Sequence, residues 1–372
     1  MEILELAFFI LTILILILFS KDYKRSYGSW YIIFVFAYIV ATRSIMVPDT
    51  DAYLSYFNIE DTNLKEYSNI VTFEYGYRFI TKVLKYLLNE STLYFGAICI
   101  LNMVLMKYGG RRLVNSYNVS TTEEKSNKII YISPLFLILY ISFFGIYLNA
   151  IVLRVGLAFS LIFLAATFAL NYSIGRIIKL AIIFLICTAA YLIHSTAIFG
   201  AIIMILLIFS NQKKKEFYIS SLIIIFLIYL FNLSGPLGVI MYNLISSTQS
   251  DIAFFNKVGG YDSGYGTFEA DGFSLKFLFF WMMSFILSWN KDENQVYYKL
   301  LNILIIGVFL HAIFRSVVLI ERITDYFTFY SIPLFYLFLI KKSKISFWIY
   351  LFALVIIQIV FVLRITNSYV TY

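Results

Sequence analysis

The sequence predicts an all-α polytopic membrane protein with about 12 transmembrane helices, within a range of about 10–13. The 372 residues are 61% hydrophobic and 13% charged, whereas charged residues make up about 25% of an ordinary soluble protein. Apolar runs of about 17–20 residues recur along the chain, and a helix needs this length to cross the hydrocarbon core. Runs such as 6–19 are continuously apolar rather than alternating, so helices are the spanning element.

The positions of the apolar runs define the spans and the segments between them. We expect one integral membrane domain over 1–372, with two longer segments outside the cytoplasm at 48–91 and 234–272. The first run begins without a basic stretch, which is atypical of a cleavable signal peptide. The spans are predicted, to within several residues, at about 3–19, 30–47, 92–107, 129–148, 150–170, 177–193, 195–210, 217–233, 273–289, 299–316, 323–340 and 345–363.

The connecting loops alternate between basic and acidic, and this alternation predicts the orientation. Basic clusters such as 213–215 and 341–344 lie on one side, and by the positive-inside rule these loops face the cytoplasm. The net charge of +8 therefore belongs to one membrane face and indicates membrane lipid, not nucleic acid, as its partner. The cysteines, Cys99 and Cys187, both lie in mid-span, so they indicate neither a redox compartment nor metal binding. The sequence contains no metal-ligand cluster of His and Cys, and we expect no metal and no cofactor.

An arginine lies near the start of the span predicted at 150–170. Asn149 occupies a turn too short to be a loop on the outer side, and Arg154 follows about 7 Å into the next helix. Snorkelling to the headgroups would be its non-functional role. An arginine inside a span usually faces protein or an aqueous cavity, which favours a functional role.

His194 interrupts an apolar stretch over 177–210. A single helix of that length would measure about 51 Å, far more than the hydrocarbon core. The chain must therefore break near 194–196, at the outer end of a hairpin. An isolated histidine is often a hydrogen-bonded structural residue, but this position is equally compatible with a proton-transfer role.

The segment 321–327 is the most polar part of the apolar run 299–340, which again exceeds one span and must break near 317–323. Glu321 and Arg322 lie there, and a continuous helix would place His311, Arg315 and Arg322 on one face. Charges at membrane depth are costly, which favours function over an internal ion pair between helices.

A further set of polar residues follows the second predicted span. Arg43 lies at its outer end, and Asp49, Asp51 and Tyr53 come next in the acidic segment. Glu74 lies in a similar acidic and aromatic stretch, 73–77. Carboxylates in loops are usually only solvated, but with an arginine at the neighbouring span end a role for one of the two aspartates is equally compatible with the sequence.

These residues resemble the EpsG family of bacterial polysaccharide polymerases, which is related to the Wzy-type O-antigen and capsule polymerases. The resemblance runs over nearly the whole chain in the expected order, although each motif is short. Gly156 stands where the family often has a bulky residue. The matching motifs are Arg43 with Asp49, Asp51, Tyr53 and Phe57; Phe73-Glu74-Tyr75-Gly76-Tyr77; Arg154-Val155-Gly156-Leu157-Ala158 with His194-Ser195; and Glu321-Arg322-Ile323 with Tyr326-Phe327.

The resemblance implies a glycosyltransferase in the bacterial cytoplasmic membrane, with a fold similar to the C-type glycosyltransferases and an extracytoplasmic active site. Its substrates would be oligosaccharide repeat units on undecaprenyl diphosphate, and a chain-length regulator and a flippase are candidate partners. Arginine binds phosphate through bidentate, permanently charged contacts. The expected diphosphate ligands are Arg154 and Arg322, with Arg43 and Arg315 as further candidates, and the expected glycan contacts are Tyr53, Tyr326 and Asn149.

The sequence leaves the catalytic base and the exact reaction open. The base could be Asp49, Asp51, Glu74, His194 or Glu321. Direct displacement with inversion needs one such group, and a retaining route is the alternative. An O-antigen ligase or another lipid-linked glycosyltransferase would have nearly the same site. A flippase or transporter should show repeat symmetry, which the sequence lacks.

Overall fold

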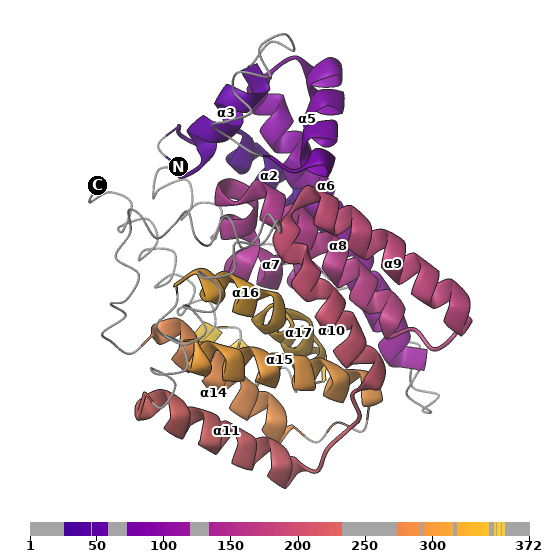
Figure 1. The fold of residues 1–372 in the computed structure, drawn as a ribbon, viewed down its shortest axis with the longest axis vertical. Helices are drawn as coiled ribbons and strands as arrows, with labels where there is room; N and C mark the ends of the chain where they lie inside the picture. The colour runs from indigo at the N-terminus through magenta and orange to yellow at the C-terminus, as the bar shows by residue number, and fades with distance from the viewer. Residues whose placement is uncertain are drawn as a thin grey trace, which may run out of the picture. The chain divides into compact units, whose positions relative to one another are not determined.

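The computed structural model describes residues 26–45, 47–58, 73–119, 134–232, 274–290, 292, 294–314, 318–341, 346, 348–350 and 352–353. Every regular element in this part of the chain is a helix (Figure 1), which confirms the all-α prediction for these residues. The chain forms two compact units. Unit 1 comprises Met1–Asn118, Glu123–Ala197 and Leu339–Tyr372, and unit 2 comprises Val119–Thr122 and Ile198–Phe338.

Unit 1 contains the helices that carry most of the predicted site. The N-terminal ones are apolar α2 and two short helices, α3 and α5, in the segment expected outside the cytoplasm. The bounds are α2 (Ser26–Ala41), α3 (Thr50–Asn58), α5 (Tyr75–Leu88), α6 (Ser91–Val119), α7 (Pro134–Tyr140), the π-helical turns η2 (Ile141–Gly145) and η3 (Tyr147–Ile151), α8 (Leu153–Ala169), α9 (Arg176–Ile193) and the 3-10 turn η4 (Ser195–Ala197).

Unit 2 is a helical bundle in which α15 packs against α10, α11, α14 and α16. Side-chain caps start two of its helices, since Ser274 Oγ accepts from Phe277 N and Asn294 Oδ1 accepts from Val296 N. The bounds are α10 (Ile198–Phe209), α11 (Lys215–Leu230), α14 (Leu275–Trp289), α15 (Gln295–Ile313), α16 (Val318–Thr328) and α17 (Ser331–Ile340).

Among the described residues, four helical stretches are long and apolar enough to cross a membrane: α6, α9, α15 and the run Ile323–Ile340. Five shorter apolar helices overlap other predicted spans. The predicted span 3–19 and most of 345–363 lie outside the described residues. The structure thus supports a membrane protein, and the figure of about 12 spans stays a prediction.

The helix breaks expected from length occur, with small shifts. The chain leaves α9 at His194, whose backbone is extended (φ −154°, ψ 124°), and re-enters a helix at Ile198. The second break comes earlier than expected, because α15 ends at Ile313 and α16 begins at Val318. Glu321 and Arg322 therefore lie inside α16 and not in a turn.

An aromatic cluster joins the short helices α3 and α5 to α6 and α8 in unit 1. Tyr53 and Phe57 on α3, Tyr77 on α5 and Tyr94 on α6 are all nearly fully buried in it. The hydroxyls of Tyr77 and Tyr94 are hydrogen-bonded at 2.6 Å, and Thr81 Oγ1 lies 3.1 Å from the Tyr94 hydroxyl. Aromatic pairs add about 0.5–1.5 kcal/mol each beyond their burial, so α3 and α5 are firmly held.

A buried amide network fixes the turn before α8. Asn149 is 1% exposed, accepts from Asn102 Nδ2 at 2.9 Å and donates to the Tyr140 hydroxyl at 3.0 Å and the Gly145 carbonyl at 2.7 Å. The side-chain amide of Asn149 is hydrogen-bonded through both its oxygen and its nitrogen, and such buried bonds specify one backbone geometry. Asn149 thus has a structural role, and its contact with glycan stays a prediction.

Candidate functional site

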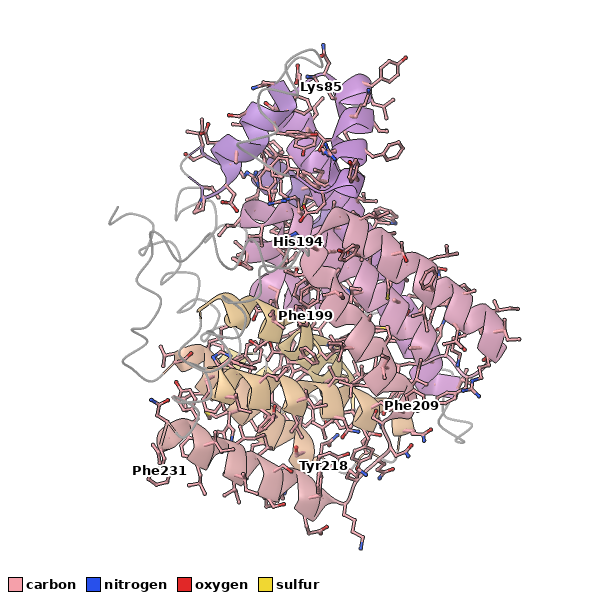
Figure 2. All side chains as sticks on the ribbon, viewed as in Figure 1. Lys85, His194, Phe199, Phe209, Tyr218 and Phe231 are labelled. Atoms are coloured by element: carbon pink, nitrogen blue, oxygen red, sulfur yellow. The ribbon has the colours of Figure 1, made fainter. Side chains whose placement is uncertain are left out.

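Three of the predicted site residues meet in unit 1: Glu74, Arg154 and His194. They come from three separate elements, the N-cap of α5, the first turn of α8 and the C-cap of α9. Figure 2 shows His194 where α9 ends. The three side chains are 15%, 20% and 13% exposed, which leaves each one partly accessible. We call these residues the Glu74 cluster.

Glu74 is the centre of the cluster because both of its carboxylate oxygens are engaged. Oε2 accepts from Arg154 Nη1 at 2.6 Å. Oε1 lies 3.0 Å from His194 Nδ1 and 3.5 Å from the backbone nitrogen of Ser195. A carboxylate held on both sides is fixed in position, and it can orient the imidazole and fix its tautomer.

Arg154 is the second residue of α8, nearer to the helix start than the sequence indicated. A cation in the first turn of a helix is unfavourable for the helix dipole, and the Glu74 carboxylate compensates it. The guanidinium lies over the Phe73 ring, with 4.4 Å between Cζ and the ring centroid. Arg154 Nε is buried and has no hydrogen-bond partner among the described residues, whereas the side chain as a whole is 20% exposed.

Tyr53 joins the cluster from α3. Burial raises the pKa of its phenol, and the charge of Arg154 and a hydrogen bond to Arg154 oppose this rise. Tyr53 therefore stays neutral at physiological pH and holds the guanidinium from a second side. Its side chain is 2% exposed, so contact with a glycan stays a prediction.

Arg43 is more deeply buried than the residues of the Glu74 cluster and contacts backbone carbonyls rather than a carboxylate. Its Nη1 donates to the backbone carbonyl of Ala150 at 2.7 Å and to that of Asn149 at 3.4 Å, and its Cζ lies 3.9 Å from the Phe95 ring centroid. It is 8% exposed. These contacts tie the end of α2 to the turn that leads into α8, and binding of diphosphate by Arg43 stays a prediction.

The two aspartates lie at the surface. Asp49 is exposed and has a positive φ of 62° in the turn before α3, and Asp51 is exposed in the first turn of α3. Carboxylates in the first turn stabilise a helix through its dipole, which gives Asp51 a structural role. The catalytic roles expected for Asp49 and Asp51 stay predictions. Asp49 is close enough to influence Tyr53 electrostatically.

The remaining predicted residues belong to unit 2. Glu321 and Arg322 lie in α16, their side chains are outside the described part of the chain, and so is Arg315 as a whole. Tyr326 is 2% exposed. The diphosphate, catalytic and glycan roles assigned to these four residues stay predictions.

Unit 2 contains an ion pair that the sequence did not predict. Lys276 Nζ on α14 lies 2.8 Å from Asp325 Oδ1 on α16. Asp325 is inside the predicted polar segment 321–327, but nothing in the sequence pointed to Lys276 as its partner. Partly buried pairs of this kind cost stability when one partner is removed.

Gly76 allows the parts of the Glu74 cluster to approach each other. A Cβ added at Gly76 would lie 2.8 Å from the backbone carbonyl of Leu192 in α9. We expect Gly76→Ala to push α5 from α9, separate Glu74 from His194 and cost about 1–3 kcal/mol of stability. Thermal unfolding of the purified protein measures this effect.

The matched control is Gly175→Ala, because a Cβ at Gly175 meets no atom within 4 Å. Both variants add one methyl group, one at each end of α9. If both gave the same unfolding temperature, the close approach of α5 to α9 would not hold.

The sequence matches the EpsG family model over residues 29–372. The chain belongs to the EpsG family. No curated protein and no solved structure matches it. Members of the EpsG family are Wzy-type polysaccharide polymerase-like proteins, so a glycosyltransferase-like polymerase role follows at the level of the family. The apolar helices and the family together indicate a membrane protein with a part in polysaccharide biosynthesis.

Proposed function

We propose that this EpsG-family protein joins oligosaccharide repeat units carried on undecaprenyl diphosphate into a surface polysaccharide, at the outer face of the bacterial cytoplasmic membrane. The Glu74 cluster is the observation that carries the proposal. It combines a partly exposed arginine with a carboxylate–histidine pair. The family supplies the reaction class.

The helix ends that carry the cluster support a position of the cluster near the membrane surface. Glu74 precedes α5, a helix that is not among the candidate spans, and its carboxylate contacts Arg154 and His194. Arg154 lies at the start of apolar α8, and His194 follows the end of the candidate span α9. Helices α8 and α9 pack against each other. Arg154 and His194 thus lie at the ends of apolar helices, and Glu74 contacts both of them, where we propose that the lipid-linked diphosphate binds.

The chemistry requires a cation for the leaving group and a base for the acceptor. The acceptor hydroxyl oxygen attacks the anomeric carbon of the donor sugar, the bond from this carbon to the diphosphate oxygen breaks, and undecaprenyl diphosphate leaves with the bonding electrons. Arg154 is proposed to stabilise the negative charge that develops on the diphosphate. The planar guanidinium can give directional contacts that lysine lacks.

We assign the base to His194. Glu74 holds Nδ1 at 3.0 Å, so the proton of the acceptor hydroxyl would pass to Nε2 at the other side of the ring. Glu74 stabilises the imidazolium that forms, as a carboxylate does when it orients a catalytic histidine. Because both carboxylate oxygens of Glu74 are engaged, Glu74 is less suited to take the proton itself. Direct displacement with inversion needs this one base.

Deletion of the gene followed by gel analysis of the surface polysaccharide tests the proposal. A polymerase deletion leaves single repeat units on the lipid and no ladder of longer chains. Complete absence of surface glycan would overturn the proposal and indicate a flippase or a ligase instead. Complementation with the unaltered gene should restore the ladder and thus excludes an effect on neighbouring genes.

A further inference from the structure

Helix α5 has one face inside the protein and an opposite apolar face outside it. Tyr77 and Thr81 are buried against Tyr94 of α6. On the other side the apolar side chains of Tyr75, Phe79, Tyr86 and Leu87 are between 66% and 89% exposed. Exposed aromatic and aliphatic residues at helical spacing form a continuous stripe, and such a stripe on a monomer marks an interaction surface.

The ends of two candidate spans fix the depth of α5 in the membrane. Helix α5 ends at Leu88, and α6 begins three residues later at Ser91. At its other end, Gly76 touches the backbone of Leu192 near the end of α9. Both α6 and α9 are long and apolar enough to cross the bilayer, and α9 is largely exposed along its length. Helix α5 therefore lies where these spans leave the hydrocarbon, at the level of the headgroups.

The charges of α5 are all of one sign. Arg78, Lys82 and Lys85 lie on this helix, and it contains no acidic residue. Lys82 is exposed, and the guanidinium of Arg78 lies 4.1 Å from the centroid of the exposed Tyr75 ring, so cations and aromatic rings alternate along the outer face. Basic residues beside an aromatic and aliphatic stripe are typical of helices that lie in the interface of anionic membranes.

We infer that the outer face of α5 is a binding surface for anionic phospholipid headgroups, with its aromatic side chains in the headgroup and acyl boundary and Arg78 and Lys82 against lipid phosphates. The surface is separate from the Glu74 cluster, but Glu74 is the N-cap of α5. Lipid bound to α5 would therefore fix the depth of Glu74 in the membrane. The importance of this depth for catalysis rests on the proposed function, whereas the lipid-binding surface of α5 does not depend on it.

A nitroxide label measures the environment of this surface without any turnover. The label is attached at Phe79→Cys in a Cys187→Ala background, because the remaining Cys99 is fully buried. The matched control is Ser55→Cys on the exposed side of α3, in the same outer segment. Each protein is placed in nanodiscs of phosphatidylcholine alone or with about one third phosphatidylglycerol. Oxygen, which partitions into lipid, and a water-soluble nickel complex are the two relaxing agents.

We expect the ratio of oxygen to nickel accessibility to be several-fold higher at position 79 than at position 55, and the label at 79 to become less mobile when phosphatidylglycerol is present. The double variant Arg78→Gln with Lys82→Gln should lose the response to phosphatidylglycerol. The control for this variant is Arg176→Gln with Lys179→Gln in the first turn of α9, away from the end of α9 that α5 approaches. The control should keep the response to phosphatidylglycerol.

Two outcomes would overturn the inference. An aqueous signature at position 79, equal to that at position 55, would show that α5 does not contact the bilayer. A label that lies in lipid but responds equally to both membranes would remove the assignment to anionic headgroups. Neither result depends on polymerase activity, so failure of the inference and failure of the proposed function are distinguishable.

Discussion

Arg154→Ala is expected to lower polymer formation in cells by about 100-fold or more, which removes the ladder of long chains and leaves single repeat units on the lipid. The physical reason is loss of the cation that stabilises the departing diphosphate. Arg154→Lys should retain only part of the activity, because a lysine keeps the charge but not the directional contacts or the planar packing on Phe73. Gel analysis of the polysaccharide, normalised to the amount of protein in the membrane, measures both effects.

The control removes an arginine of the same unit that has no part in the cluster. Arg176 is exposed at the start of α9, and Arg176→Ala should leave the ladder unchanged. An internal ion pair is the alternative role for Arg154. Exchange of the pair, Glu74→Arg with Arg154→Glu, separates the two roles, since it keeps an ion pair but moves the cation. A ladder of normal length from the exchanged protein would show that Arg154 serves structure alone.

The second large effect is expected from Glu74→Gln. Glutamine keeps the size of the side chain and can still accept a hydrogen bond from Arg154, but it cannot stabilise an imidazolium. In comparable carboxylate–histidine pairs the neutral amide lowers turnover by up to about 10⁴-fold, so the ladder should disappear while the protein remains in the membrane. Pulse labelling of new polysaccharide, with protein quantified by immunoblot, gives the rate.

Rescue by imidazole tests the role of the histidine itself. In isolated membranes, His194→Ala should be inactive and should regain part of its activity when imidazole is added, which a purely structural histidine would not show. Ser195→Ala is the neighbouring control, because only the backbone nitrogen of Ser195 approaches Glu74 and its hydroxyl has no hydrogen-bond partner among the described residues. Full activity of His194→Ala without imidazole would contradict the assignment of the base.

Much of the fold could be predicted because lipid imposes strict rules on sequence. Apolar length predicted the helices and the breaks at His194 and after α15, since a helix longer than the bilayer must turn. The break after α15 came several residues early, because apolar length does not fix which residue ends a helix. For the same reason, Arg154 proved to lie closer to the start of α8 than expected.

The candidate site could be predicted only as a set of residues on one side of the membrane. Glu74 and His194 both belonged to that set, but their separation of 120 residues gave no sign that they share a hydrogen bond. Asn149 and Arg43 belonged to it too, and both make buried contacts with protein groups that charge patterns cannot reveal.

The sequence by itself determined the membrane class, the helical architecture and the family, because hydrophobic length, charge asymmetry and short motifs are properties of the chain alone. Only the tertiary structure decided which charges are partners. Packing of the aromatic cluster holds α5 against α6, and Gly76 lets α5 approach α9 closely enough for Glu74 to reach both Arg154 and His194. Ion pairing depends on distances of a few ångströms, and long-range packing sets these distances.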